Sequence, residues 1–136
     1  MHTITLVPGD LSLTRPARWL AALFQQAVVF RALGAIAEIE VRGSEQLGKI
    51  RTPCVFVANH SSHLDTLCIM RALPWSLRLR IAVPAAADYW FRNPLVGALA
   101  SLLFNLVPLR RAGCPFGDLK RAGKLLENGW SLIIFP

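Results

Sequence analysis

The chain has 136 residues, about one domain, and 54% of them are hydrophobic. No uncharged apolar run reaches the ~20 residues of a spanning helix, and we expect no secretory leader, so the chain should lie on a membrane rather than cross it. The net charge is +7, and residues 69–136 hold nine Lys or Arg against three Asp or Glu, whereas residues 1–68 hold six against five. This basic half indicates a polyanionic partner, and because zinc-finger, basic-zipper and RNA-binding aromatic patterns are absent, we expect no nucleic-acid partner.

The first predicted element is a long apolar helix. We expect residues 1–14 to be a flexible or extended lead-in; Pro16 suits the first turn of a helix, and residues 17–37 predict the helix itself. The helix is either part of the core or an interfacial membrane helix, and we assign residues 1–38 to this lead-in segment and residues 39–136 to the domain that follows. The side chains that suit a membrane headgroup boundary are Trp19, Phe24, Phe30, Arg15, Arg18 and Arg31.

Strands and helices then alternate along the chain. We expect strands at residues 38–42, 54–58, 79–83, 104–109 and 131–135. We expect helices at residues 63–73, 88–91, 95–103 and 115–127, the last closed by a left-handed cap at Asn128-Gly129. Such alternation predicts an α/β fold with a largely parallel sheet flanked by helices, in which ligands gather at the carboxyl ends of the strands.

One segment after the second predicted strand carries the chemistry. It reads Asn59-His60-Ser61-Ser62-His63-Leu64-Asp65. Positions five apart on one helix point about 140° away from each other, so His60 and Asp65 can meet only if the chain turns between them. Asn and Ser favour such a break, and we expect Ser61 and Ser62 to act as caps and His63 as a helix-start residue. A His held by a carboxylate at a strand-to-helix turn predicts a general base acting on a hydroxyl.

The same segment matches the N-H-x-x-x-x-D signature of the glycerolipid acyltransferases, the lysophosphatidate acyltransferase family. Upstream, Val41-Arg42-Gly43 resembles the strand and glycine that precede the signature in that family. Downstream, the run from Phe104 to Arg110 is similar to a second family motif, an apolar strand that ends in Arg. A third motif would begin at Phe135-Pro136, so we expect the acyltransferase domain to be incomplete at its C-terminal end.

The resemblance implies transfer of a fatty acyl group from acyl-CoA or acyl-ACP to the hydroxyl of a lysophosphatidate-like acceptor, in phospholipid biosynthesis and with no metal or other cofactor. His60 would take the hydroxyl proton and Asp65 would hold the imidazole, as in a Ser-His-Asp triad. Arg110 would bind the acceptor phosphate, with Asn59 as a further substrate-binding residue. The apolar helix and the basic half lead us to expect peripheral attachment to the cytoplasmic face of an anionic membrane.

Two alternatives stay open. His60, His63 and Asp65 supply three potential metal ligands, which would suit a metal-dependent hydrolase. The other alternative is a non-catalytic membrane-surface fragment of the same fold. The odd number of cysteines and the absence of C-x-x-C lead us to expect reduced thiols without a chemical role at Cys54, Cys68 and Cys114.

Overall fold

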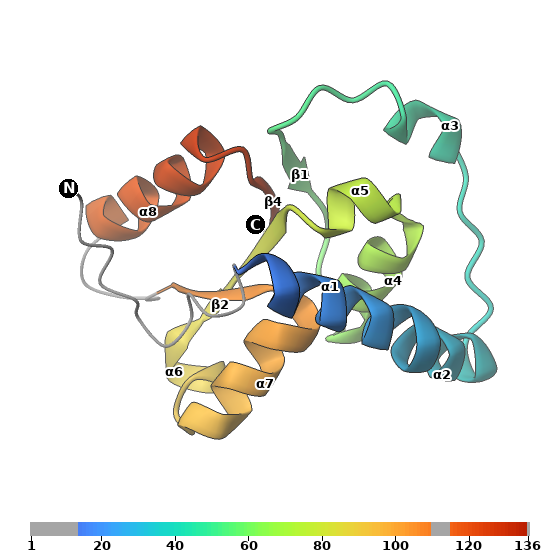
Figure 1. Cartoon of the computed structure of the whole chain (residues 1–136), viewed down its shortest axis with the longest axis horizontal. Helices are drawn as coiled ribbons and strands as arrows, with labels where there is room; N and C mark the ends of the chain where they lie inside the picture. The colour runs from blue at the N-terminus through green and yellow to red at the C-terminus, as the bar shows by residue number, and fades with distance from the viewer. Residues whose placement is uncertain (1–13, 110–114, 136) are drawn as a thin grey trace.

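The computed structural model describes residues 14–109 and 115–135, and within them one parallel sheet organises the chain (Figure 1). The strands lie in the order β1 (Val55–Val57), β4 (Ser131–Ile134), β2 (Ile81–Ala86) and β3 (Leu106–Leu109). All three strand pairs are parallel. The predicted α/β fold with a parallel sheet is therefore confirmed, and the carboxyl ends of the strands meet at one edge.

Helices fill the connections between the strands. The N-terminal helices are α1 (Arg15–Phe24), the π-helical segment η2 (Gln25–Val29), α2 (Phe30–Ile36) and α3 (Ser44–Leu47). The later helices are α4 (Leu64–Ala72), α5 (Trp75–Arg78), α6 (Ala87–Trp90), α7 (Pro94–Phe104) and α8 (Pro115–Glu127). In Figure 1, α8 lies on one side of the sheet, and α1, α4 and α7 lie on the other.

Each face of the sheet is covered by its own apolar cluster, because successive strand residues point to opposite faces. Towards α8, the buried cluster consists of Ala82, Val107, Leu125, Trp130 and Leu132. Towards the other helices, it consists of Phe30, Met70, Leu73, Leu77, Ile81, Val83, Ala100, Leu106 and Ile133. Burial on both faces explains why the strands are nearly continuous apolar runs rather than alternating ones.

The N-terminal helical segment packs one face against the domain. It runs from Arg15 to Ile36 and is long and apolar enough to cross a membrane, by length and composition alone. Its buried side chains include Phe30, which belongs to the main apolar cluster. Arg18 donates a hydrogen bond to the carbonyl of Leu79 and Gln25 donates one to the carbonyl of Leu103, so polar side chains also anchor the segment to the domain.

Three local expectations were wrong. Residues 38–42 do not form a strand: no neighbouring strand pairs with them, and Val41 is 41% exposed. Two short helices, α3 and α5, occur where neither a helix nor a strand was predicted; α5 follows Pro74, whose carbonyl accepts hydrogen bonds from the N–H groups of Leu77 and Arg78. Strand β2 runs three residues further than expected, to Ala86, because it pairs with β3 from Val83 to Ala86. The strand tolerates Pro84 because β4 pairs with β2 only at Ile81 and Ala82, so that at Pro84 the strand is paired with β3 alone.

Candidate active site

The turn after β1 places His60 at the carboxyl edge of the sheet. The Ala58 N–H still donates to the carbonyl of Ile134, at 3.1 Å, so the β1–β4 ladder continues one residue beyond β1. The chain then leaves the sheet, and α4 begins at Leu64. The sequence expectation that His60 lies where a strand ends is confirmed.

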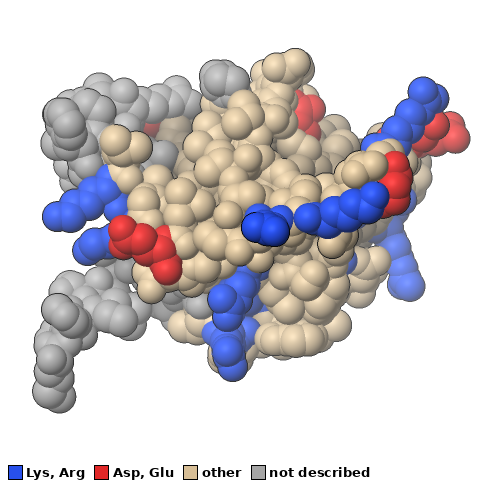
Figure 2. Space-filling model, turned by 90° about the horizontal axis from the view of Figure 1, so that it is seen from above, with Lys and Arg blue, Asp and Glu red and all other residues tan. Residues whose placement is uncertain are grey.

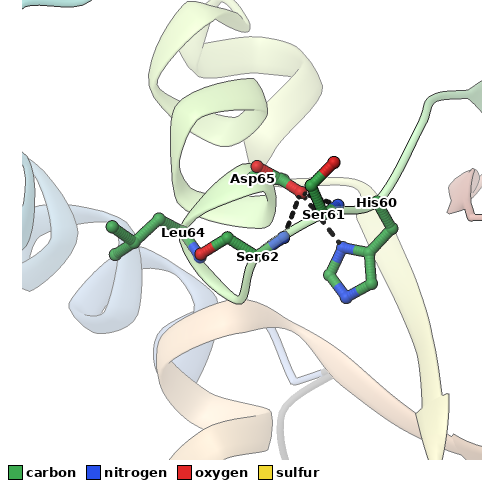
Figure 3. A network of polar contacts seen from close by, with 5 residues as sticks. All are labelled: His60, Ser61, Ser62, Leu64 and Asp65. Atoms are coloured by element: carbon green, nitrogen blue, oxygen red, sulfur yellow. Dashed lines mark hydrogen bonds and ion pairs between the residues drawn. The ribbon is translucent and has the colours of Figure 1, made fainter.

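Hydrogen bonds within the segment itself make this turn (Figure 3). The Asp65 carboxylate accepts from the backbone N–H groups of Ser61 and Ser62 through Oδ2, at 2.6 and 2.7 Å. The Ser62 hydroxyl accepts from the N–H of Leu64, at 3.2 Å, and the N–H of Asp65 donates to the backbone carbonyl of Ser62, at 3.0 Å. The arrangement resembles a capping box at a helix start, except that the serine hydroxyl accepts from Leu64 and not from Asp65. Ser62 therefore caps the helix through its hydroxyl as expected, whereas Ser61 contributes its backbone.

The same Asp65 oxygen faces His60. The distance from His60 Nδ1 to Asp65 Oδ2 is 3.5 Å, and Nε2 lies on the side of the ring away from the carboxylate (Figure 3). The backbone N–H of Ser62, then that of Ser61, lowers the pKa of Asp65, and the nearby His60 lowers it further. The carboxylate is consequently ionised at neutral pH and favours the tautomer with the proton on Nδ1, which leaves the Nε2 lone pair available as a base.

His60 stands at a cavity of about 590 Å³ on the same edge of the sheet. The cavity walls come from the segment after β1, from β2, β3 and the end of β4, and from α4, α6 and the last residue of α7. Most of the lining side chains are apolar, among them Leu67, Ala85 and Phe135. The Phe135 ring lies against His60, with 4.4 Å between ring centroids. The arrangement sets a potential base beside an apolar chamber, as suits a substrate with a reacting polar group and a long apolar portion.

An aromatic cluster in this cavity was not anticipated. His63 stacks on Tyr89, with 5.8 Å between centroids and an interplanar angle of 13°, and meets the edge of Trp90 at 5.7 Å. Tyr89 is 59% exposed, and both Tyr89 and Trp90 line the cavity. One sequence signal could have located them, because they follow β2 at the edge where ligands gather in parallel sheets.

The other predicted site residues are not brought into the cavity by the described structure. Asn59 is exposed and is not among the residues that line the cavity, although it precedes His60 directly. Arg110 lies outside the described residues; β3 ends at Leu109, in register with Ala86 at the same sheet edge.

The described residues do not contain a set of metal ligands of the kind that the metal-dependent hydrolase alternative requires. Across residues 14–109 and 115–135, no group of three or more His, Cys, Asp or Glu side chains is arranged to hold a metal ion. His60 and His63 face each other edge to face, with 6.2 Å between ring centroids. Of the cysteines, Cys54 and Cys68 are free thiols, and Cys114 lies outside the described residues.

Comparison with known proteins identifies the family. The model of the family described as Acyltransferase matches residues 38–136, which are 99 of the chain's 136 residues. The chain belongs to the glycerolipid acyltransferase family. The matched range contains the His60–Asp65 turn and β1 to β4, so the family match covers the whole sheet described above.

Two plant members of this family are similar to the chain. One is the chloroplastic 1-acyl-sn-glycerol-3-phosphate acyltransferase BAT2 of Brassica napus, 31% identical over 71% of this chain and 27% of its own length. The other is the chloroplastic 1-acyl-sn-glycerol-3-phosphate acyltransferase LPAT1 of Arabidopsis thaliana, 32% identical over 73% of this chain and 26% of its own length. The chain thus spans about a quarter of the length of these relatives. No solved structure matches it significantly.

Proposed function

We propose that the protein transfers a fatty acyl group from an acyl thioester, on coenzyme A or acyl carrier protein, to the hydroxyl of a lysophosphatidate-like acceptor in phospholipid biosynthesis. The observation that carries the proposal is the His60–Asp65 pair at an apolar cavity on the carboxyl edge of the sheet. Membership of the acyltransferase family supports the reaction type, and the names of the two plant relatives support the acceptor class.

In the proposed reaction, His60 Nε2 takes the proton of the acceptor hydroxyl as the hydroxyl oxygen attacks the thioester carbonyl carbon. A carbon–oxygen bond forms and the carbon–sulfur bond breaks, and the proton then passes from His60 to the leaving thiolate. Asp65 keeps the imidazole oriented through Nδ1 and stabilises the imidazolium while His60 holds the proton. The 3.5 Å separation is long for a hydrogen bond and is expected to shorten when substrate is bound.

Different residues are proposed to bind the acyl chain of the donor and the phosphate of the acceptor. Its apolar walls, which include Leu67 and Phe135, suit the acyl chain of the donor. The family motif assigns the acceptor phosphate to Arg110, whose forked guanidinium matches paired phosphate oxygens. Asn59 is proposed as a further substrate contact on the same ground, since it begins the signature that contains His60.

Substitution of His60 tests this proposal directly. We expect His60→Ala to lower the rate of acyl transfer by at least about 100-fold, the minimum contribution of a general base, and Asp65→Asn to be nearly as damaging. The measurement is thiol release from an acyl thioester in the presence of lysophosphatidate, with circular dichroism and thermal melting to confirm folding. His63→Ala is the matched control and should be much milder. A His60→Ala variant that keeps more than about a tenth of the rate contradicts the role of His60.

We also propose that the protein attaches peripherally to the cytoplasmic face of an anionic membrane. The support is the row of exposed apolar side chains on the N-terminal helical segment, including Trp19, Leu20 and Leu23, together with the basic second half of the chain. On the face shown in Figure 2, uncharged residues cover most of the surface, and the basic side chains occur at several separate places among them. Apolar contact is therefore proposed to act together with dispersed charge.

A further inference from the structure

A second cavity, of about 570 Å³, lies between the N-terminal helical segment and α4. We call it the α1–α4 groove; its described lining includes Leu23, Gln26, Phe30, Arg31, Gly34 and Arg71. None of these residues lines the His60 cavity. The groove is thus a separate site, and acyl transfer at His60 does not account for it.

The polar side chains that line the groove are two arginines and one glutamine. Arg71 reaches across from α4, where its Nη1 donates to the carbonyl of Phe30 at 3.3 Å. The guanidinium lies so close to Gly34 that a Cβ at this position would come within 3.0 Å of Nη1. Arg31 provides a second guanidinium, and among the described lining residues none carries a carboxylate. Two cations without a counter-ion in the same groove favour an anionic ligand.

A buried arginine adds positive charge next to the groove. Arg78 is only 7% exposed, and its Nη2 donates to Gln26 Oε1 at 2.9 Å. Its Nε and Nη1 have no hydrogen-bond partner among the described residues. Because the Oε1 of Gln26 is occupied by Arg78, the amide NH₂ is the part of Gln26 that can donate to a ligand in the groove. Among the described lining side chains, the polar groups left for a ligand are therefore the Gln26 amide NH₂ and the guanidinium groups of Arg31 and Arg71.

The wall of the groove continues into exposed apolar surface. Leu23 lines the groove and is itself exposed, and Leu20, Phe24 and Val28 on the same helical segment are exposed large apolar side chains. Binding of a small soluble anion would require only the two arginines of the groove. A ligand whose anionic group is attached to long apolar chains would use the arginines and this apolar row together.

We propose that the α1–α4 groove binds the headgroup phosphate of an anionic phospholipid in the membrane surface, with the acyl chains of that lipid against the apolar row. Arg31 and Arg71 contact the phosphate from two sides, and the Gln26 amide donates to it. The proposal rests on the proposed membrane attachment and not on acyl transfer. It makes the groove a lipid site that orients the protein on the membrane.

The test compares the double variant Arg31→Gln/Arg71→Gln with the matched control Lys49→Gln/Arg51→Gln, which removes the same charge from exposed positions elsewhere. Partitioning is measured by sedimentation with phosphatidylcholine vesicles that contain phosphatidylglycerol. We expect the groove variant to weaken partitioning by about tenfold or more and the control to weaken it much less. Equal losses in the two variants would show that only net charge matters and would overturn the proposal.

A second measurement separates a lipid site from a simple anion site. Dihexanoyl phosphatidylglycerol, kept below its micelle-forming concentration, should bind the wild type and the control saturably in calorimetric titration and bind the groove variant at least about tenfold more weakly. Inorganic phosphate binding as tightly as this lipid would overturn the proposal. Because Arg71 also bonds Phe30, the single variant Arg31→Gln provides the comparison if the double variant melts early.

Acyl transfer from a water-soluble thioester, measured without vesicles, should be unchanged in the groove variant. Loss of that activity in the folded groove variant would place the arginines in the reaction and overturn the separate-site proposal. An inactive wild type that still shows groove-dependent lipid binding would reject the proposed reaction alone and leave the lipid site supported.

Discussion

At the scale of single residues, Asp65 performs two tasks with one oxygen. Its Oδ2 accepts the two backbone N–H groups that form the turn and also faces His60 Nδ1. The helix start therefore fixes the position of the carboxylate independently of the histidine. A group held in this way can orient His60 without a large rearrangement, which is how a short local segment is able to build a preorganised pair.

The pH dependence of stability should report this carboxylate. The pKa of Asp65 is lowered below 3.8 in the folded chain, chiefly by the backbone N–H of Ser62. A lowered folded pKa means that the carboxylate stabilises the fold above 3.8 and that this contribution is lost as the pH falls through the folded pKa. The difference in melting temperature between the wild type and Asp65→Asn should therefore shrink as the pH falls below 3.8. A difference that stays constant from neutral pH into this range would contradict the assignment.

At the scale of elements, the end of α8 shows how a local sequence signal sets the start of a core strand. The N–H of Trp130 donates to the carbonyl of Leu125 and that of Gly129 to the carbonyl of Leu126, both at 2.9 Å. These two bonds define a Schellman cap with Gly129 in the left-handed position, at φ +79°. The predicted cap is confirmed, and it turns the chain from α8 directly into β4 at Ser131.

Gly123 inside α8 and Gly129 in the cap that follows it should respond to substitution with opposite sign. Gly129→Ala should cost about 1–2 kcal/mol of unfolding free energy, because a Cβ is strained at this φ and would also lie 3.0 Å from Arg80 Nη1. Gly123→Ala, inside α8 with open space around its Cα, should stabilise the chain by about 0.5–1 kcal/mol. Urea unfolding of both variants checks the pair. A neutral or stabilising Gly129→Ala would contradict the strained cap.

At the scale of the whole molecule, the N-terminal helical segment has one face buried against the domain and one face exposed. Its inner face contributes Phe30 and Leu33 to buried positions and is anchored by Arg18 and Gln25, whereas its outer face exposes large apolar side chains. The guanidinium of Arg18 lies 4.5 Å from the centroid of the Trp130 ring, a cation–π contact that further ties the helix to the domain. The proposed attachment, with the helix parallel to the membrane surface, rests on this anchored inner face and exposed apolar outer face.

Salt dependence should separate the two contributions to membrane attachment. Sedimentation with anionic vesicles should weaken as the salt concentration rises, because surface charges are screened beyond a Debye length of about 10 Å at 0.1 M. Binding to neutral vesicles should be weaker at low salt, where the basic half makes no favourable contact with the lipid headgroups. Equal binding to neutral vesicles in high salt would indicate insertion of the helix, and the absence of binding to either vesicle would reject membrane attachment.

The sequence by itself determined those parts of the molecule that depend on local contacts. His60 and Asp65 lie within one turn whose hydrogen bonds all join residues at most five positions apart, so the motif predicted their meeting. The α8 cap is local in the same sense. The α/β class also followed from the chain, because the alternation of apolar strands and helices limits the possible layers.

Only the tertiary structure decided how these local pieces are combined. The strand order β1-β4-β2-β3 pairs segments far apart in the chain, as in the register of Val55 with Leu132, and no local pattern specifies it. That pairing brings Phe135 against His60 and sets Tyr89 beside His63. The alternation at 38–42 predicted a strand that does not form, because a strand requires a neighbour to satisfy its backbone groups, and in the described structure the sheet offers none there.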